Sequence, residues 1–179
     1  MTTGSVTLYI ATSVDGYIAD EDGSVAWLEA FEDAASEEDV ETYTAFLASV
    51  DCLVMGARTD EQVLTFGAWP YDDKPTYVCT HRDLSPASDA VKFVDRPVGS
   101  LSSTLKNRYG RIWLVGGAAL AQSFFREGEI DDLRLSLVPM LLGSGVRLFD
   151  GGCDRQRLRP LDTASRDTGI VEHRYEVLD

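Results

Sequence analysis

The chain contains few of the residues that build disulfide frameworks and zinc sites. Its 179 residues include three cysteines and two histidines, with no Cys-x-x-Cys pair. We therefore expect neither a disulfide-stabilised secreted fold nor a metal site. No apolar run approaches the ~20 residues that span a membrane, and the N-terminus has no basic segment followed by an apolar one. These absences predict a cytoplasmic protein that does not act at a membrane.

Positive charge is also scarce. The formal net charge is −14, and thirteen arginines are accompanied by only three lysines. Such a surface repels nucleic acid, so nucleic acid is not an expected partner. Two interpretations of the charge stay open. The protein is either a well-solubilised acidic enzyme or one adapted to a high-salt cytoplasm, where screening weakens the repulsion between its own charges.

What is present is a globular composition, with 44% apolar residues. The length fits one domain covering residues 1–179. Strand-like and helical stretches alternate up to Gly128, and consecutive strand-like stretches follow it. This order predicts an α/β fold with a mostly parallel central sheet and an antiparallel C-terminal edge. The expected strands cover 5–11, 52–55, 75–80, 91–94, 111–115, 133–138, 146–149, 158–163 and 170–177, and the expected helices cover 37–49, 60–65, 101–108 and the residues after Gly117 up to Arg126.

Two glycine turns follow strand-like segments and precede helical ones. Gly116-Gly117 ends an apolar run at residues 111–115, and Gly56 ends another at 51–55. The free N–H groups and positive dipole at a helix N-terminus favour phosphate. A glycine pair alone is equally consistent with a tight packing turn. Two such strand ends in one α/β chain predict a long phosphorylated cofactor that lies across the sheet edge.

Four blocks occur in a characteristic order: residues 10–19 (IATSVDGYIA), 55–59 (MGART), 115–117 (VGG) and 130–149. Together they resemble the dihydrofolate-reductase-like superfamily. Within it they are most similar to the C-terminal reductase domain of bacterial riboflavin-biosynthesis deaminase/reductase proteins. The resemblance implies a three-layer fold with a central, mostly parallel sheet between helices. It also implies NADPH bound across the carboxyl ends of the strands, and a homodimer.

The resemblance carries a set of cofactor-binding residues over to this chain. Ala11 and Ile18 would line the nicotinamide pocket. The other positions follow strands: Gly56, Arg58 and Thr59 for the pyrophosphate and adenosine, Thr80, His81 and Arg82 for the adenosine 2′-phosphate, and Gly116, Gly117, Ala118, Ala119 and Leu120 for the pyrophosphate and nicotinamide. Each also has an ordinary explanation as core, turn or loop. Ala57 replaces the first arginine of the family's Gly-Arg-Arg-Thr sequence, so a preference for NADPH depends on the remaining cations.

The substrate side departs further from the riboflavin-type reductases. Tyr17 stands where they usually have lysine, and residues 20–39 contain many carboxylates but no Arg, Lys or His. Such a field repels a phosphorylated sugar. Asp39 is the nearest match to the acid with which folate reductases assist protonation of a pterin. It is also explained as a first-turn acid that completes a capping box with Ser36.

Two further polar residues are candidates for the catalytic site. Ser136 aligns with a small hydroxyl that contacts the substrate ring in folate reductases, or it faces solvent. Asp15 lies in the loop over the nicotinamide, or it belongs to an ordinary Asp-Gly turn. We expect an NADPH-dependent reductase that transfers a hydride to a small planar heterocycle, pterin- or pyrimidine-like. The alternative is a non-catalytic nucleotide-binding or dimerising domain that kept the fold.

The segment from Leu133 to Phe149 is strongly apolar. Its alternation stops at Val138, and Met140, Leu141 and Leu142 follow. This pattern predicts burial on both faces, either by the domain's own helices or by a second copy. The resemblance favours the second copy, and hence a homodimer.

Overall fold

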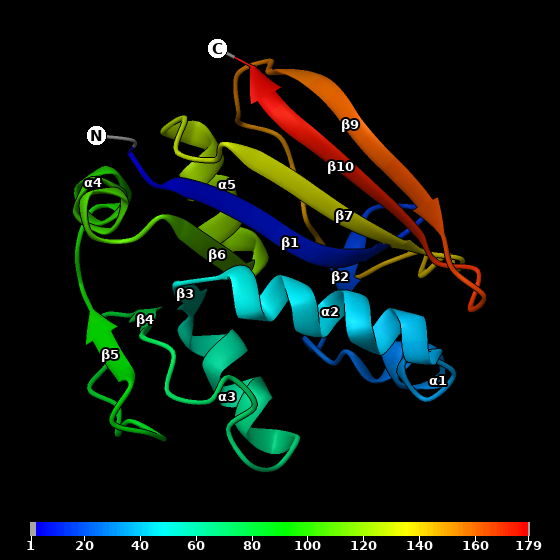
Figure 1. Ribbon diagram of the computed structural model, residues 1–179, viewed down its shortest axis with the longest axis horizontal. Helices are drawn as coiled ribbons and strands as arrows, with labels where there is room; N and C mark the ends of the chain where they lie inside the picture. The colour runs from blue at the N-terminus through cyan, green and yellow to red at the C-terminus, as the bar shows by residue number, and fades with distance from the viewer. Residues whose placement is uncertain (1–2, 179) are drawn as a thin grey trace.

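A central sheet of eight strands organises the computed structural model, which describes residues 3–178 (Figure 1). In spatial order the strands are β5 (Val91–Val94), β4 (Thr76–Cys79), β3 (Cys52–Gly56), β6 (Arg111–Gly116), β1 (Ser5–Ser13), β7 (Asp132–Val138), β10 (Val171–Leu178) and β9 (Arg157–Ser165). Neighbours from β5 to β7 run parallel, whereas β10 runs antiparallel to both β7 and β9. The predicted parallel sheet with an antiparallel C-terminal edge is confirmed.

Helices cover both faces of this sheet. On one face lie α2 (Glu37–Ser49) and α3 (Ala57–Thr65), and on the other α4 (Val98–Arg108) and α5 (Ala118–Arg126) (Figure 1). Each face of the sheet has its own hydrophobic core, and side chains along β6 point alternately into the two. Trp113 packs on the α2 side, and its neighbours Ile112 and Leu114 pack with α4 and α5. A 3-10 turn η1 (Ala26–Leu28) and the short helix α1 (Glu29–Glu32) precede α2.

The helix boundaries show which local signals the sequence carries. Helix α2 spans the predicted residues, and Ser36 and Asp39 form the predicted capping box at its N-terminus. Helix α3 begins at Ala57 rather than at residue 60, since Gly56 in an extended conformation ends β3 and starts the helix at once. Helix α4 likewise starts at Val98, before the apolar spacing begins.

Two expectations about irregular segments are corrected. Residues 13–23, where no strand is expected, contain a short strand, β2 (Tyr17–Ala19). It pairs with β8 (Val146–Arg147), which is shorter than the strand expected at 146–149. Burial of the Leu133–Phe149 segment on both faces within the protomer is wrong. Strand β7 ends at Val138, so the alternation stops because the strand stops, and Leu141 is 71% exposed. Within residues 3–178, no helix is both long and apolar enough to cross a membrane.

Candidate functional site

A groove of about 880 Å³ runs along the carboxyl ends of β3 and β6. Its walls come from α3, α5, β2 and the start of β8. Nine of the thirteen predicted cofactor-binding residues line it: Ile18, Gly56, Arg58, Thr59, Arg82, Gly117, Ala118, Ala119 and Leu120. We call this space the groove. The structure thus brings most of the predicted cofactor residues together at one edge of the sheet.

Bare backbone forms the floor of the groove. A Cβ atom built on Gly117 would lie 3.5 Å from Thr59 Oγ1 and 3.9 Å from Ile18 Cδ1, so it would project between two lining side chains. A Cβ on Gly56 would lie 3.8 Å from the Gly117 nitrogen. The peptide bond between Gly116 and Gly117 is cis. Helices α3 and α5 both start here, so their free N–H groups and the absent side chains fit a pyrophosphate.

The predicted 2′-phosphate residues are only partly assembled. Arg58 and Arg82 line the groove, and Arg82 Nη1 lies 2.9 Å from Glu61 Oε1. His81 lies outside it, with Nδ1 2.7 Å from Asp95 Oδ1, a contact that raises the pKa of His81. Thr80 accepts a hydrogen bond from the Arg82 N–H instead of facing the groove. The cations that can recognise a 2′-phosphate are therefore the two arginines.

A second cavity, of about 350 Å³, lies between the sheet and the α1–α2 segment. We call it the polar cavity. Its apolar walls are Leu28, Phe31, Tyr43, Trp113, Val138 and Ile170, and its charged or hydroxyl-bearing lining includes Tyr9, Glu32, Asp39, Ser136, Arg166 and Glu172. Two predicted catalytic residues, Asp39 and Ser136, thus face the same cavity, and Ala11 lines it too. Neither Gly116 nor Asp15 is among the residues that line this cavity or the groove.

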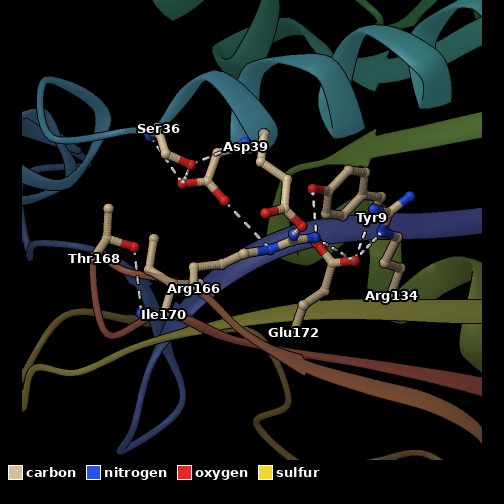
Figure 2. Close-up of polar contacts among 9 residues, drawn as sticks. Tyr9, Ser36, Asp39, Arg134, Arg166, Thr168, Ile170 and Glu172 are labelled. Atoms are coloured by element: carbon tan, nitrogen blue, oxygen red, sulfur yellow. Dashed lines mark hydrogen bonds and ion pairs between the residues drawn. The ribbon is translucent and has the colours of Figure 1, made fainter.

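A buried ion-pair network forms one side of the polar cavity (Figure 2). Glu172 Oε1 accepts from Arg134 Nε at 2.7 Å, and Oε2 accepts from the Tyr9 hydroxyl at 3.1 Å. The Arg134 guanidinium also lies 4.4 Å from the centre of the Tyr9 ring. Burial, and then the charge of Glu172, raise the pKa of Tyr9. Tyr9 is therefore a neutral hydroxyl donor at neutral pH.

The strand register places the central side chains next to one another. Ala11 on β1 is paired with Ser136 on β7, which is paired with Glu172 on β10. The leucines of β7 point to the opposite face, where Leu133 packs into the core. Ser136 therefore faces the cavity rather than bulk solvent, beside the residue expected to meet the nicotinamide.

Asp39 combines the two roles that the sequence left open. Its Oδ2 accepts from the Ser36 N–H at 3.0 Å and from the Ser36 hydroxyl at 2.9 Å, which completes the capping box. Its Oδ1 lies 3.4 Å from Arg166 Nε, on the side of the cavity (Figure 2). One carboxylate thus caps α2 and contributes charge to the cavity.

Asp15 belongs to the loop rather than to a cavity. Its carboxylate accepts from the Ser13 hydroxyl at 2.5 Å and from the N–H groups of Leu142 and Gly143 at 3.1 and 2.8 Å. These hydrogen bonds, that of Ser13 first, lower its pKa to about 2. The structure supports its interpretation as a turn residue that ties the β1–β2 turn to the segment after β7.

Sequence reasoning missed Tyr9, Arg134, Arg166 and Glu172. The pairs that they form are separated by 38 positions between Arg134 and Glu172 and by 163 between Tyr9 and Glu172, so no local pattern reveals them. One signal was available. Arg134 alternates with the leucines of β7, and a long charged side chain inside a sheet must find a partner if helices cover that face.

A parallel sheet with a reversed C-terminal edge, and a glycine-floored groove at its carboxyl end, define the dihydrofolate-reductase-like class of folds. The particular family follows from comparison with known proteins. The family model described as the RibD C-terminal domain matches residues 4–171, and the chain belongs to this family.

Individual relatives agree with this membership. The uncharacterized protein YwjB of Bacillus subtilis (strain 168) is 38% identical over 93% of this chain and 94% of its own length. A Shewanella sp. PV-4 crystal structure, of a protein assigned to riboflavin biosynthesis, superposes with a TM-score of 0.87 at 29% identity, covering 98% of this chain and 99% of its own. Acinetobacter baumannii RibD shares the fold at 18% identity, with a TM-score of 0.77, and this chain spans 59% of it.

Proposed function

We propose that this protein is an NADPH-dependent reductase that transfers a hydride to a small planar heterocycle, pterin- or pyrimidine-like. The proximity of the two cavities carries the proposal. Ile10 lines the polar cavity, and its Cδ1 would lie only 3.1 Å from a Cβ atom built on Gly116, next to the glycine that lines the groove. A cofactor in the groove and a ring in the polar cavity would therefore meet at the end of β1.

The groove residues fit the cofactor. The Gly56 and Gly117 backbones and the N-termini of α3 and α5 would hold the pyrophosphate. Arg58 and Arg82 would hold the 2′-phosphate. When bound, NADPH supplies a hydride, which is a hydrogen nucleus with two electrons, to a C=N or C=O carbon.

The polar cavity would orient the acceptor. Phe31, Tyr43 and Trp113 offer apolar surface to a flat ring and exclude water from it. The Ser136 hydroxyl beside Ala11 can donate to a ring nitrogen or oxygen. The Tyr9 hydroxyl donates to Glu172, so its oxygen can accept from a ring N–H.

Cofactor titration followed by a turnover assay tests the proposal. We expect NADPH to bind more tightly than NADH, and the bound dihydronicotinamide to be oxidised by at least one compound in a panel of oxidised pterins and pyrimidines. Binding without oxidation by any of them would support a non-catalytic nucleotide-binding domain instead. Failure to bind either cofactor would contradict both.

We also propose that the protein forms a homodimer in the cytoplasm. Leu141 and Phe149 are 71% and 45% exposed, and the edge strand β9 adds exposed Leu158 and Leu161. Exposed leucines on an unpaired edge favour association with a second copy. Sedimentation equilibrium of the wild type and of Leu141→Asp measures it, and a monomeric wild type would contradict the dimer.

A further inference from the structure

The polar cavity has an excess of negative charge. Among the residues that line it, Glu32, Asp39 and Glu172 are acidic and Arg166 alone is basic. Arg134 balances the negative charge of Glu172, because its Nη2 lies 2.7 Å from Glu172 Oε1. A ligand in the cavity therefore meets the carboxylates of Glu32 and Asp39 with a single guanidinium beside them.

The entrance from the α1–α2 side adds to this charge. Residues 20–39 contain nine acidic residues and no Lys, Arg or His. Residues 26–39, with six of these acids, form η1, α1 and the first turn of α2, which border the cavity, whereas Asp22 lines the groove. A phosphate dianion would be repelled along this whole approach.

Arg166 is held loosely by comparison with Arg134. Its nitrogens lie 3.4 Å from Asp39 Oδ1 and 3.8 Å from both Glu38 Oε1 and Glu172 Oε1. These separations exceed the usual length of a charge-assisted hydrogen bond. Its side chain is 14% exposed, lines the cavity and lies between the carboxylates of Asp39 and Glu172 (Figure 2).

Arg166 and Asp39 together present donors beside an acceptor. A guanidinium donates to a carbonyl oxygen, and the neighbouring carboxylate accepts from a ring N–H. A lactam edge, with C=O next to N–H, offers the complementary pair. The volume of about 350 Å³ is at the small end for a ligand site and suits one or two fused rings.

We infer that the polar cavity selects an uncharged or cationic planar ring with a lactam edge and rejects the same ring carrying a ribose phosphate. Arg166 and Asp39 recognise the lactam edge, and Glu32 contributes to the rejection of phosphate. This inference rests on the proposed function only in naming the cavity as the substrate site. Ligand binding can be measured without cofactor, so the two can fail separately.

The first experiment uses calorimetry on the wild type with pterin and with the matched series uracil, uridine and uridine 5′-monophosphate. Comparison with uridine separates the effect of the attached ribose from the effect of the phosphate charge. We expect pterin and uracil to bind, and uridine 5′-monophosphate to bind at least about tenfold more weakly than uridine at low salt, with a smaller ratio at high salt. Equal or tighter binding of the phosphate ester overturns the inference, as does failure of both pterin and uracil to bind.

Two substitutions on the same short helix provide the matched control. Both are exposed acids of α1, but Glu32 lines the cavity and Glu29 does not. Glu32→Lys should tighten binding of uridine 5′-monophosphate by about tenfold and leave uridine nearly unchanged. Glu29→Lys should change the ratio much less. If both variants gained the same affinity for uridine 5′-monophosphate, the change in net charge would explain the effect. That result would contradict a role for the cavity lining.

Arg166 is tested by changing its shape and its charge separately. Arg166→Met should weaken pterin and uracil by about tenfold, and Arg166→Lys should restore only part of the loss, because an ammonium lacks the planar fork. Circular dichroism checks that each variant is folded. Unchanged pterin affinity in a folded Arg166→Met protein would overturn recognition by this residue. If Arg166→Met weakened pterin and uracil as expected but the protein did not bind NADPH, the proposed reductase would be refuted. The assignment of the polar cavity as a ring-binding site would stand.

Discussion

The groove and the polar cavity lie side by side but are built differently. The floor of the groove consists of backbone and small side chains, and two short stretches, residues 56–59 and 117–120, supply eight of its eighteen lining residues. The polar cavity consists of side chains from η1, α1, α2, β1, β6, β7, β10 and the β9–β10 turn. A site made of backbone is encoded locally, whereas a site made of side chains depends on the whole fold to assemble it.

The same contrast appears in the ion pairs. Arg82 and Glu61 border the groove with side chains 53% and 49% exposed, whereas Arg134 and Glu172 border the cavity at 11% and 8%. Water screens the first pair and is excluded from the second. The polar cavity therefore depends on its charges for stability as well as for recognition.

Removing the buried acid should produce the largest effect on stability. Glu172→Ala leaves Arg134 without its carboxylate and Tyr9 without its acceptor. We expect the free energy of unfolding to fall by about 3–5 kcal/mol. Urea unfolding at neutral pH measures this, with Glu61→Gln as the exposed control that should change little. Similar small losses in both variants would contradict the contrast between the two regions.

The groove should be more sensitive in binding than in folding. Arg58→Ala should weaken NADPH by more than about tenfold and NADH much less, because a charge-assisted hydrogen bond to the 2′-phosphate contributes about 1.5–3 kcal/mol. Arg82→Ala should have a smaller effect, since Arg82 is already paired with Glu61. Titration with both cofactors decides. Equal losses for NADPH and NADH would place the arginine at the shared pyrophosphate instead.

A single methyl group should separate cofactor binding from ring binding. At Gly117 a Cβ has ordinary contact distances to Thr59 and Ile18, so Gly117→Ala should fold normally. It should weaken NADPH by about tenfold, because the methyl occupies the floor of the groove. Ser136→Ala should do the reverse, leaving NADPH affinity intact and weakening ring ligands. Calorimetry on both variants measures the affinity for NADPH and for a ring ligand. If one variant lost affinity for both ligands, the two sites would not be separate.

A carboxylate outside both regions should have the smallest effect, and one that depends on pH. Folding lowers the pKa of Asp15 from 3.8 to about 2. Its contribution to stability is therefore complete above pH 3.8 and is lost as the pH falls toward 2. The melting temperature of Asp15→Asn should be below that of the wild type at pH 6, and the gap should narrow at pH 3. If the difference in melting temperature widened on acidification, the hydrogen-bonded Asp15 carboxylate would not be the source of the stability.

The two regions differ in how far the sequence predicts them. The order of strands and helices, the Ser36 capping box and most of the groove follow from glycines, periodicity and resemblance. The structure places His81 and Thr80 outside the groove, because His81 pairs with Asp95 and Thr80 accepts from the Arg82 N–H. Glu172 and Arg166 were missed because the sequence alone predicts the C-terminal strands as an ordinary edge. The register beside β7 turns Glu172 toward the cavity, and the β9–β10 turn brings Arg166 to it.

The arrangement of the sheet edge also bears on how such proteins diverge. Among residues 3–178, none that lines the groove lies beyond Val146, whereas the hairpin of β9 and β10 supplies Arg166 and Glu172 to the polar cavity. Substitutions in this hairpin can therefore change the lining of the polar cavity while the lining of the groove stays the same. A terminal hairpin of this kind lets one fold vary one of its two sites independently of the other.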